Sequence, residues 1–313
     1  MPADRAPAKR DRGTGAPGVN GRGIGAPGVI KMRALAKINL SLHIVGVRPD
    51  GYHELRTILQ SIALHDTLTI RVRRGPLELQ CDEPACPTGP TNLVWRAAER
   101  VWAASKRRGK PRDVAIHLAK RIPLQACLGG GSSDAAATLR ALGSLWDVDQ
   151  ARLGEIARSL GADVPYFFEG GTVLGLERGD LLFPLLDSRA AWVVLVIPDF
   201  GVSTEEAYGW WDRSVGRALS DPPVDLQNDL QAPVAVHHPE ITRIVRALTR
   251  AGGSYAAMSG SGSAVFGLFD CRPAADRAVG VLGRRGWRTM LSRTVSRTAY
   301  QRLARISHSP DRF

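Results

Sequence analysis

The residues best suited to chemistry form a glycine-rich run at 128–137, Leu-Gly-Gly-Gly-Ser-Ser-Asp-Ala-Ala-Ala. Its three glycines let the backbone approach a ligand closely, and we expect Ser132 and Ser133 to reach the N-cap of an alanine-rich helix. Free backbone N–H groups and the positive helix end would hold an anion such as phosphate. No Lys-Ser or Lys-Thr pair follows the glycines, so this is not a Walker A loop. A tight strand-to-helix turn without a ligand is the alternative.

A carboxylate and a second small loop are further candidates. Asp163 lies in Gly-Ala-Asp-Val-Pro, just past an expected helix end, and Pro165 keeps its neighbour extended, so a stiff segment presents the carboxylate. It is either a reactive group or a solvated turn residue. The Gly-Ser-Gly run at 260–262 separates two expected strands. It either supplies more N–H donors to a phosphate or simply connects a hairpin.

A lysine and an asparagine share one face of a predicted strand. From Ala36 to Ile44 apolar and polar residues alternate, which is typical of a half-buried strand. Because the period is two, Lys37 and Asn39 project from the same face, opposite the apolar residues. Tyr52 and His53 follow in a turn-like segment, where the tyrosine could be an aromatic residue at the edge of the core and the histidine a hydrogen-bonded turn residue.

The elements that must position these groups alternate between strands and helices. We expect a helix from Asn92, another through Leu153 and Leu160, and a capping box at 203–206 that opens a third. Further strands are expected at 68–72, 114–118, 192–197, 254–258, 264–269 and 288–295, with helices at 239–252 and from 273. This order favours an α+β protein whose second half is a split βαβ sheet. We place the boundary between Leu182 and Arg189.

The first 31 residues differ from the rest. They are rich in Gly, Pro and Arg and contain Gly-Ala-Pro-Gly-Val twice, so we expect a disordered tail. Two G-x-G-x-x-G matches within it follow no strand and are false positives for a dinucleotide fold. The predicted organisation is a tail at 1–31, a first domain at 32–185 and a second at 186–306.

Composition narrows the function classes. The 313 residues carry a net charge of +12, but the excess is spread along the chain without clustered arginines and interleaved aromatics, which argues against a nucleic-acid binder. No apolar run is long enough to span a membrane and no signal-peptide pattern is present, so we expect a cytoplasmic protein with no membrane partner. The four cysteines lack zinc-site spacing and are predicted to be free thiols, and no metal ligand is assigned.

Five motifs in the same order carry a family resemblance. They are Ala-Lys-Ile-Asn-Leu at 36–40, Gly-Tyr-His-Glu-Leu at 51–55, Pro123 with the glycine run, Gly-Ala-Asp-Val-Pro at 161–165, and the Gly-Ser loop at 259–266. The sequence resembles the 4-diphosphocytidyl-2-C-methyl-D-erythritol kinases of the GHMP superfamily from Met32 to about Arg302. The two glycine-containing loops are general to the superfamily, whereas the first two motifs are specific to this family.

The resemblance implies a two-domain GHMP kinase fold, with a mixed N-terminal sheet and a ferredoxin-like C-terminal domain. It implies transfer of a phosphoryl group from ATP, with Mg²⁺, to the 2-hydroxyl of 4-diphosphocytidyl-2-C-methyl-D-erythritol in the non-mevalonate isoprenoid pathway. Asp163 would be the general base and Lys37 its charged partner. The implied ATP-binding residues are Pro123, Leu128, Gly129, Gly130, Gly131, Ser132, Ser133 and Asn92. The implied substrate-binding residues are Asn39, Tyr52, His53, Tyr208, Gly260 and Gly262.

Other interpretations stay open. Another GHMP kinase, acting on homoserine or mevalonate, would share the glycine loop but needs no cytidine pocket. A catalytically inactive nucleotide-binding protein should lack Lys37 or Asp163, and both are present. The sequence departs from the family at 125–127, where Gln-Ala-Cys replaces small residues. A positive φ at Cys127 would cost about 1–2 kcal/mol. The protein would act as a monomer or homodimer.

Overall fold

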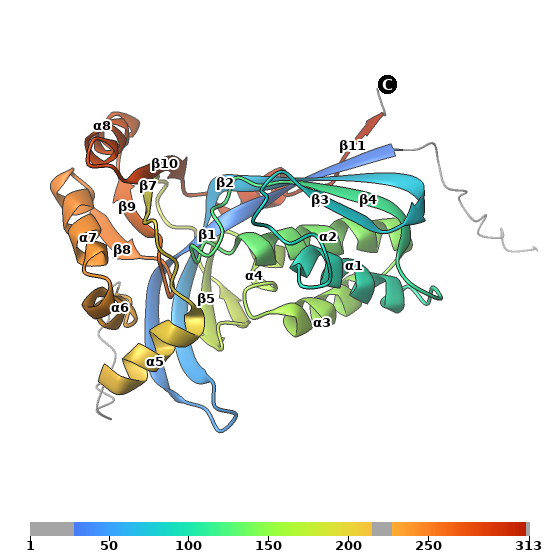
Figure 1. Ribbon diagram of the computed structural model, residues 1–313, viewed down its shortest axis with the longest axis horizontal. Helices are drawn as coiled ribbons and strands as arrows, with labels where there is room; N and C mark the ends of the chain where they lie inside the picture. Colours follow the sequence, from blue (N-terminus) through green and yellow to red (C-terminus); the bar gives the residue numbers. More distant parts are fainter. Residues whose placement is uncertain (1–27, 215–226, 311–313) are drawn as a thin grey trace, which may run out of the picture.

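The computed structural model describes residues 28–214 and 227–310. Its first sheet has seven strands in the described chain, in which β3 and β4 pair in parallel and all other pairs are antiparallel. These are β1 (Gly28–Val47), β2 (His53–Pro76), β3 (Glu78–Cys81), β4 (Arg112–Ala119), β5 (Thr172–Glu177), β6 (Leu181–Pro184) and β11 (Ser307–Pro310). The tip of the long β1–β2 hairpin extends beyond the other strands of this sheet, on the side of the second domain (Figure 1).

Helices cover one face of the first sheet (Figure 1). They are α1 (Leu93–Ala104), α2 (Gly130–Trp146), α3 (Gln150–Leu160), α4 (Tyr166–Glu169) and α9 (Arg297–Leu303). The predicted start of α1 is confirmed, because the Asn92 side chain accepts a hydrogen bond from the Val94 N–H and caps the helix. Ala135, Ala136, Leu139 and Leu142 of α2 are buried in the core of the first domain, and this packing holds the start of α2 against β1.

The second domain is a four-stranded antiparallel sheet in the order β10-β7-β9-β8. Its strands are β7 (Trp192–Ile197), β8 (Tyr255–Met258), β9 (Val265–Phe269) and β10 (Arg288–Arg293), and its helices are α5 (Thr204–Ser214), α6 (Gln231–His237), α7 (Glu240–Arg250) and α8 (Arg272–Gly283). This order is the split βαβ arrangement, so the predicted α+β class is confirmed. The predicted capping box is present as well, since Ser203 and Glu206 exchange side-chain and backbone hydrogen bonds.

The two sheets share a hydrophobic cluster that joins the domains. Ile38 and Ile62 from the first sheet pack with Leu195 and Phe266 from the second, and all four are buried. The polar face of β1 is also buried, with Lys37 2% and Asn39 4% exposed. The expectation of a half-buried strand was therefore wrong, because the second domain and the glycine loop cover the face that would otherwise meet solvent.

The ends of the described chain differ from the predicted domain limits. Strand β1 begins at Gly28 instead of Met32, and Val29 and Ile30 are buried where β1 pairs with β2 and β11. The predicted tail therefore ends four residues late, and its residues 1–27 lie outside the described part. At the other end α9 and β11 return to the first domain, since Tyr300 packs in its core. The second domain is thus narrower than 186–306.

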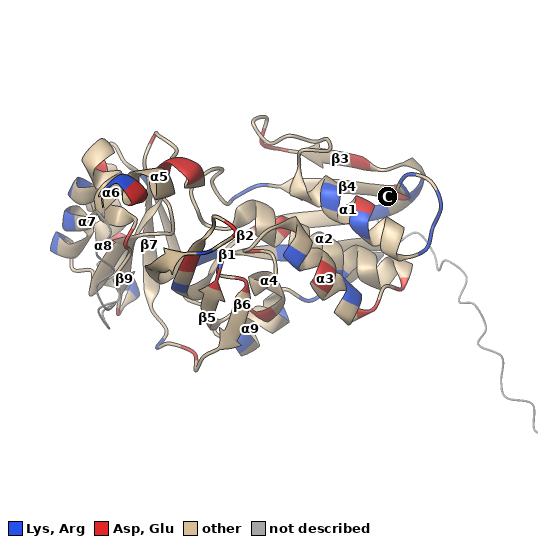
Figure 2. Ribbon diagram, turned by 90° about the horizontal axis from the view of Figure 1, so that it is seen from below, with Lys and Arg blue, Asp and Glu red and all other residues tan. Residues whose placement is uncertain are grey.

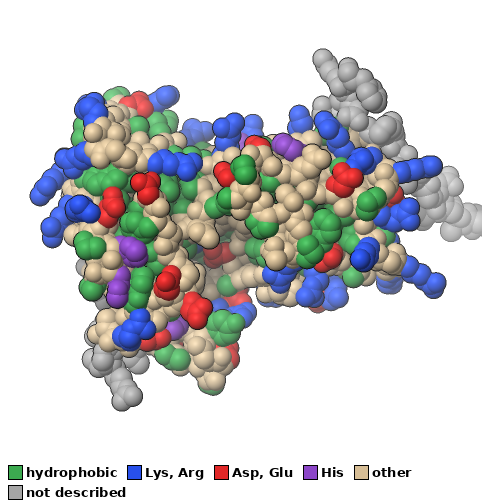
Figure 3. All heavy atoms as spheres, in the orientation of Figure 1, with side chains coloured by type: hydrophobic (Ala, Val, Ile, Leu, Met, Phe, Trp, Pro, Cys, Tyr) green, Lys and Arg blue, Asp and Glu red, His purple; other side chains and the backbone are tan. Residues whose placement is uncertain are grey.

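Basic and acidic side chains are interspersed over both domains (Figure 2), and lysines and arginines surround the outline in the space-filling view (Figure 3). In the described ranges, no helix is both long and apolar enough to cross a membrane. Figure 3 also shows that the surface is hollowed between the two domains.

Candidate active site

Lys37 and Asp163, which are 126 positions apart in the sequence, meet in the structure. The Lys37 Nζ atom lies 3.3 Å from Asp163 Oδ2. Lys37 projects from the buried face of β1, while Asp163 lies in the short turn between α3 and α4. The carboxylate is 38% exposed and faces a cavity that the lysine also lines. A carboxylate that is open to a cavity can accept a proton from a group bound there.

Lys37 keeps its charge although it is buried. Burial is the largest single effect and works against the charged form, but the Coulomb attractions of Asp163 and Cys127 and the hydrogen bond to Asp163 together outweigh it, so the pKa of Lys37 is raised. The ammonium also donates a hydrogen bond to Asn39 Oδ1 at 2.7 Å, and Asn39 Nδ2 donates to Thr57 Oγ1 at 2.8 Å. Asn39 is thus committed to orienting Lys37, while its side chain still lines the cavity.

The glycine loop packs directly on this pair. Gly129, with φ +72°, is the N-cap of α2, and a β-carbon there would lie 2.6 Å from Phe167 Cζ and 3.0 Å from Lys37 Cγ. Only glycine allows both the backbone conformation and the close approach. The serines lie in the first turn of α2, so the expectation that they form the N-cap was wrong. Ser132 lines the cavity, whereas Ser133 is buried and its hydroxyl donates to the Leu35 carbonyl.

The Gly-Ser loop of the second domain closes the other side of the cavity. Ser259 Oγ accepts a hydrogen bond from the Asn39 N–H and donates to the Cys127 carbonyl, which fastens this loop to both β1 and the glycine loop. A β-carbon on Gly260 would lie 2.4 Å from Cys127 Sγ. Cys127 does adopt a positive φ of +52°, and its thiol fills the space that the glycine leaves. Gly260 lines the cavity, whereas Gly262 is buried in the turn and does not.

Two cavities adjoin at this site. The smaller, of about 290 Å³, contains the Lys37–Asp163 pair, the Ser132 hydroxyl and the Gly-Ser loop. The larger, of about 720 Å³, lies between the tip of the β1–β2 hairpin, the end of α3 and the start of α5. Residues that line both are Leu55, Ala162, Arg178, Thr204 and Tyr208. A ligand in the larger cavity can therefore reach the reactive pair past these five residues.

Aromatic groups gather in the larger cavity. The rings of His53 and Tyr208 lie 4.5 Å apart, and Trp211 meets the His53 ring edge-on at 5.6 Å. The His53 Nε2 atom lies 2.8 Å from Asp212 Oδ1, which fixes the imidazole plane. Tyr52 is 57% exposed at the cavity rim. The predicted substrate residues of the hairpin and of α5 are thus brought together, and they offer aromatic faces and a polar ring nitrogen to a planar ligand.

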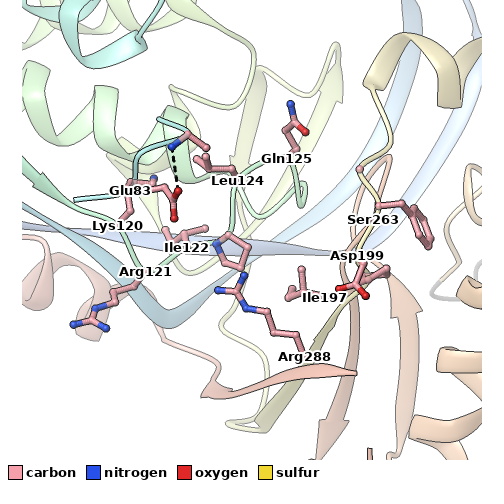
Figure 4. Close-up of a pocket in the computed structure, with 15 residues that line it drawn as sticks. Glu83, Lys120, Arg121, Ile122, Leu124, Gln125, Ile197, Asp199, Ser263 and Arg288 are labelled. Atoms are coloured by element: carbon pink, nitrogen blue, oxygen red, sulfur yellow. Dashed lines mark hydrogen bonds between the residues drawn. The ribbon is translucent and has the colours of Figure 1, made fainter. Parts of the chain in front are cut away.

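Two predicted ATP-binding residues lie away from the reactive pair. The side chain of Asn92 is occupied by its cap, because its amide also donates to the Pro87 carbonyl at 2.6 Å. Pro123 lines a separate cavity of about 370 Å³, together with Lys120, Asp199 and Arg288 (Figure 4). Leu128 is buried, and its carbonyl accepts a hydrogen bond from the Lys37 N–H, so it joins the glycine loop to β1.

A buried charge cluster supports the start of α2. Lys120 Nζ lies 2.5 Å from Asp66 Oδ2 and 2.8 Å from Asp134 Oδ2, and all three side chains are 4% exposed or less. Asp66 also accepts hydrogen bonds from the N–H groups of Arg121 and Ile122. Burial raises the pKa of Asp134 to about 8. Burial and the nearby Asp66 carboxylate favour the protonated form of Asp134, whereas Lys120 opposes it.

Comparison with known proteins agrees with this architecture. The family models "GHMP kinases N terminal domain" and "GHMP kinases C terminal" match residues 92–171 and 213–288. A 4-diphosphocytidyl-2-C-methyl-D-erythritol kinase from Solibacter usitatus (strain Ellin6076) is 42% identical over 301 residues, covering 89% of this chain and 92% of the relative. The chain belongs to this kinase family.

Further relatives extend the match over nearly whole proteins. The kinase of the same name from Moorella thermoacetica (strain ATCC 39073 / JCM 9320) is 40% identical, covering 85% of this chain and 99% of its own. A crystal structure of 4-(cytidine 5'-diphospho)-2C-methyl-D-erythritol kinase matches with a TM-score of 0.70 at 34% identity, over 84% of this chain and 98% of that one. The chain is therefore a GHMP small-molecule kinase with ATP as a substrate.

Sequence reasoning missed several residues of the kinase site. Thr57, Arg178, Thr204 and Ser261 line the cavities, and Asp212 holds His53. Thr57 could have been found only by pairing β1 with β2, which brings it beside the polar face of β1. The signal for Arg178 was its Arg-Gly-Asp turn between two short strands, a place where an exposed charge is held by a tight backbone.

Proposed function

We propose that this kinase transfers the γ-phosphoryl group of ATP to the 2-hydroxyl of 4-diphosphocytidyl-2-C-methyl-D-erythritol. The observation that carries the proposal is the Lys37–Asp163 pair, placed where the cavity with the aromatic groups meets the cavity with the glycine loop. A cytidine and a reacting hydroxyl at opposite ends of one substrate would fit these two connected spaces. We also propose that the enzyme acts in the cytoplasm, as a monomer or homodimer.

Asp163 would take the proton of the attacking hydroxyl as the bond to phosphorus forms. Its carboxylate is open to the cavity, which suits a group that must touch substrate. Lys37 would stabilise the developing negative charge on the hydroxyl oxygen. Asn39 would hold the lysine in position through the hydrogen bond at its ammonium.

The glycine loop would hold the ATP phosphates. The backbone N–H groups of Gly130 and Gly131 belong to the first turn of α2, where they have no helical acceptor and where the helix dipole favours an anion. The Ser132 hydroxyl faces the same cavity. Phosphoryl transfer depends mainly on such positioning and charge neutralisation, and the site provides both.

A magnesium ion would have to arrive with the nucleotide. Among the described residues no group of three or more His, Cys, Asp or Glu could hold a metal. Oxygen ligands do line the cavity, however, in the Ser132 hydroxyl and the Asp163 carboxylate. This fits Mg²⁺, which is usually bound by one or two protein oxygens together with substrate phosphates and water. The ion would neutralise phosphate charge during transfer.

The test is a coupled assay of ADP release with three acceptors. We expect turnover with 4-diphosphocytidyl-2-C-methyl-D-erythritol and none above background with homoserine or mevalonate, because only the first substrate fills the aromatic cavity. Product analysis by ³¹P NMR should show a new phosphate monoester. Turnover of homoserine or mevalonate without turnover of the cytidylylated acceptor would refute the proposed substrate.

A further inference from the structure

Arg178 lies at the boundary of the two cavities. It lines both, whereas Arg158 lines only the larger and Lys37 only the smaller. Lys37 is already paired with Asp163 and hydrogen-bonded to Asn39. Of the arginines and lysines that line these two cavities in the described chain, Arg178 is thus the one that lies where the cavities meet.

The Arg178 guanidinium is held in place from two sides. Its Nη2 atom donates to Asp180 Oδ2 at 2.6 Å, and its Cζ atom lies 5.4 Å from the centre of the Tyr52 ring. The Arg178 side chain is 37% exposed, and its other N–H groups have no recorded partner in the described chain. An arginine with one edge fixed and the remaining donors open is suited to binding a phosphate with two hydrogen bonds.

The backbone that carries Arg178 is a tight turn against β2. Gly179 has φ +88°, its N–H donates to the Leu176 carbonyl, and a β-carbon on it would lie 3.8 Å from Thr57 Cγ2. A β-carbon on Gly175 would lie 2.9 Å from the Gly179 carbonyl oxygen. The turn is therefore packed over β2, which borders the smaller cavity, so the backbone that carries Arg178 is held in place.

We propose that Arg178 binds the diphosphate of the acceptor substrate and so sets the distance between its nucleoside and its reacting hydroxyl. The inference rests on the proposed function. In that substrate a diphosphate links the cytidine to the sugar alcohol. If the cytosine lies among Tyr52, His53 and Tyr208 and the hydroxyl lies at Asp163, the diphosphate must cross the cavity boundary beside Arg178. A fixed arginine there recognises the feature that separates a nucleoside diphosphate from a nucleoside.

The experiment compares the binding of CDP and cytidine by calorimetry, with a non-hydrolysable ATP analogue at saturation so that the ATP site is filled. The variants are Arg178→Ala, Arg178→Lys and the control Arg158→Ala, which removes a positive charge from the larger cavity alone. We expect Arg178→Ala to weaken CDP binding roughly 10- to 100-fold, as for the loss of charge-assisted hydrogen bonds, with cytidine binding changed less than about 3-fold. Arg178→Lys should lie in between, and Arg158→Ala should leave the ratio of the two affinities unaltered.

Kinetics supply the second measurement. Arg178→Ala should raise KM for the cytidylylated acceptor by a similar factor and leave KM for ATP within about 2-fold. Equal weakening of CDP and cytidine would show that Arg178 merely supports Tyr52, and unchanged CDP affinity would place the diphosphate elsewhere; either result overturns the inference. Failure of the proposed function would instead appear in the wild-type protein, as no binding of CDP and no turnover of the acceptor.

Discussion

At the scale of single residues, the proposed function assigns reaction to one group of side chains and recognition to another. Asp163 and Lys37 form a pair whose lysine is buried and whose carboxylate is open. Burial alone would discharge an ammonium, but the adjacent carboxylate keeps the lysine protonated. The Lys37 charge is therefore stable in its buried place because of Asp163.

Removal of the Asp163 charge tests whether this residue is the general base. We expect Asp163→Asn to lower kcat roughly 10²- to 10⁴-fold, because the amide cannot accept the hydroxyl proton. The fold should be retained because asparagine keeps the shape of the side chain, but the melting temperature should fall, since buried Lys37 loses its charged partner. The coupled assay and a thermal melt measure the two quantities. Turnover close to that of the wild type would remove Asp163 from the mechanism.

Substitution of His53 tests whether this side chain binds the cytosine of the substrate. We expect His53→Ala to raise KM for the cytidylylated acceptor and to lower kcat/KM by about one to two decades, because a hydrogen bond and a stacking surface beside Tyr208 are lost. KM for ATP serves as the internal control and should stay the same. The reverse pattern, with a raised KM for ATP alone, would assign this cavity to ATP.

At the scale of elements, the start of α2 is held by the charge cluster as well as by the glycine loop. Asp66 on β2, Lys120 after β4 and Asp134 on α2 join three elements through buried ionic contacts. The Asp134 Oδ1 atom has no hydrogen-bond partner in the described chain. A proton on Asp134 therefore lowers the cost of burying this side chain.

This cluster predicts a pH dependence of stability. The pKa of Asp134 is raised to about 8 in the folded protein, so between about pH 4 and 8 the folded chain holds a proton that the unfolded chain has released. The free energy of unfolding should therefore fall as pH rises through this window. In Asp134→Asn the contribution is absent, and the curve should be flatter.

Urea unfolding at pH 5, 6.5 and 8 measures this effect. The stability of the wild type minus that of Asp134→Asn should decrease steadily over the three values, since other titrating groups are common to both proteins. Lys120 keeps its charge throughout, because its pKa is raised by the two carboxylates against the opposing effect of burial. Parallel pH profiles for the two proteins would show that Asp134 is ionised across the window.

At the scale of the whole molecule, the chain closes on itself. The first residues of β1 pair with β11 near the end of the chain, and α9 packs on α4 in the first domain, where the Tyr300 hydroxyl donates to the Phe167 carbonyl. The site is likewise composite, since the first domain supplies the reactive pair and the second supplies Tyr208 and the Gly-Ser loop. Domain packing is therefore needed for the complete cavity.

Removal of the first residues of β1 tests how much their pairing with β11 contributes to stability. A chain that begins at Met32 should melt more than about 5 °C below one that begins at Gly28, because it lacks buried Val29 and Ile30 and their pairing with β11. Each buried side chain of this size contributes about 1.5–3 kcal/mol, and 1 kcal/mol shifts the melting temperature of a chain of nearly 300 residues by roughly 1.5–2 °C. Differential scanning calorimetry of both chains measures the shift. Equal melting temperatures would mean that β1 is stable without its first four residues.

Local signals in the sequence determined where several helices, strands and turns of this protein begin. The helix cap at Asn92, the capping box at Ser203, the strand that runs through Ala36 and the turn at the glycine loop depend on neighbours within a few residues, and each is present in the structure. Periodicity and capping act over one or two helical turns, so a sequence can display them directly.

Tertiary structure alone decided what these elements form together. Lys37 meets Asp163, Cys127 fills the space left by Gly260, and Arg178 reaches the boundary of two cavities through contacts between distant segments. The polar face of β1 is buried for the same reason, although its alternation alone indicates an exposed face. Such contacts follow from how the two sheets and the hairpin pack, and no periodicity within one segment specifies which residue will cover another.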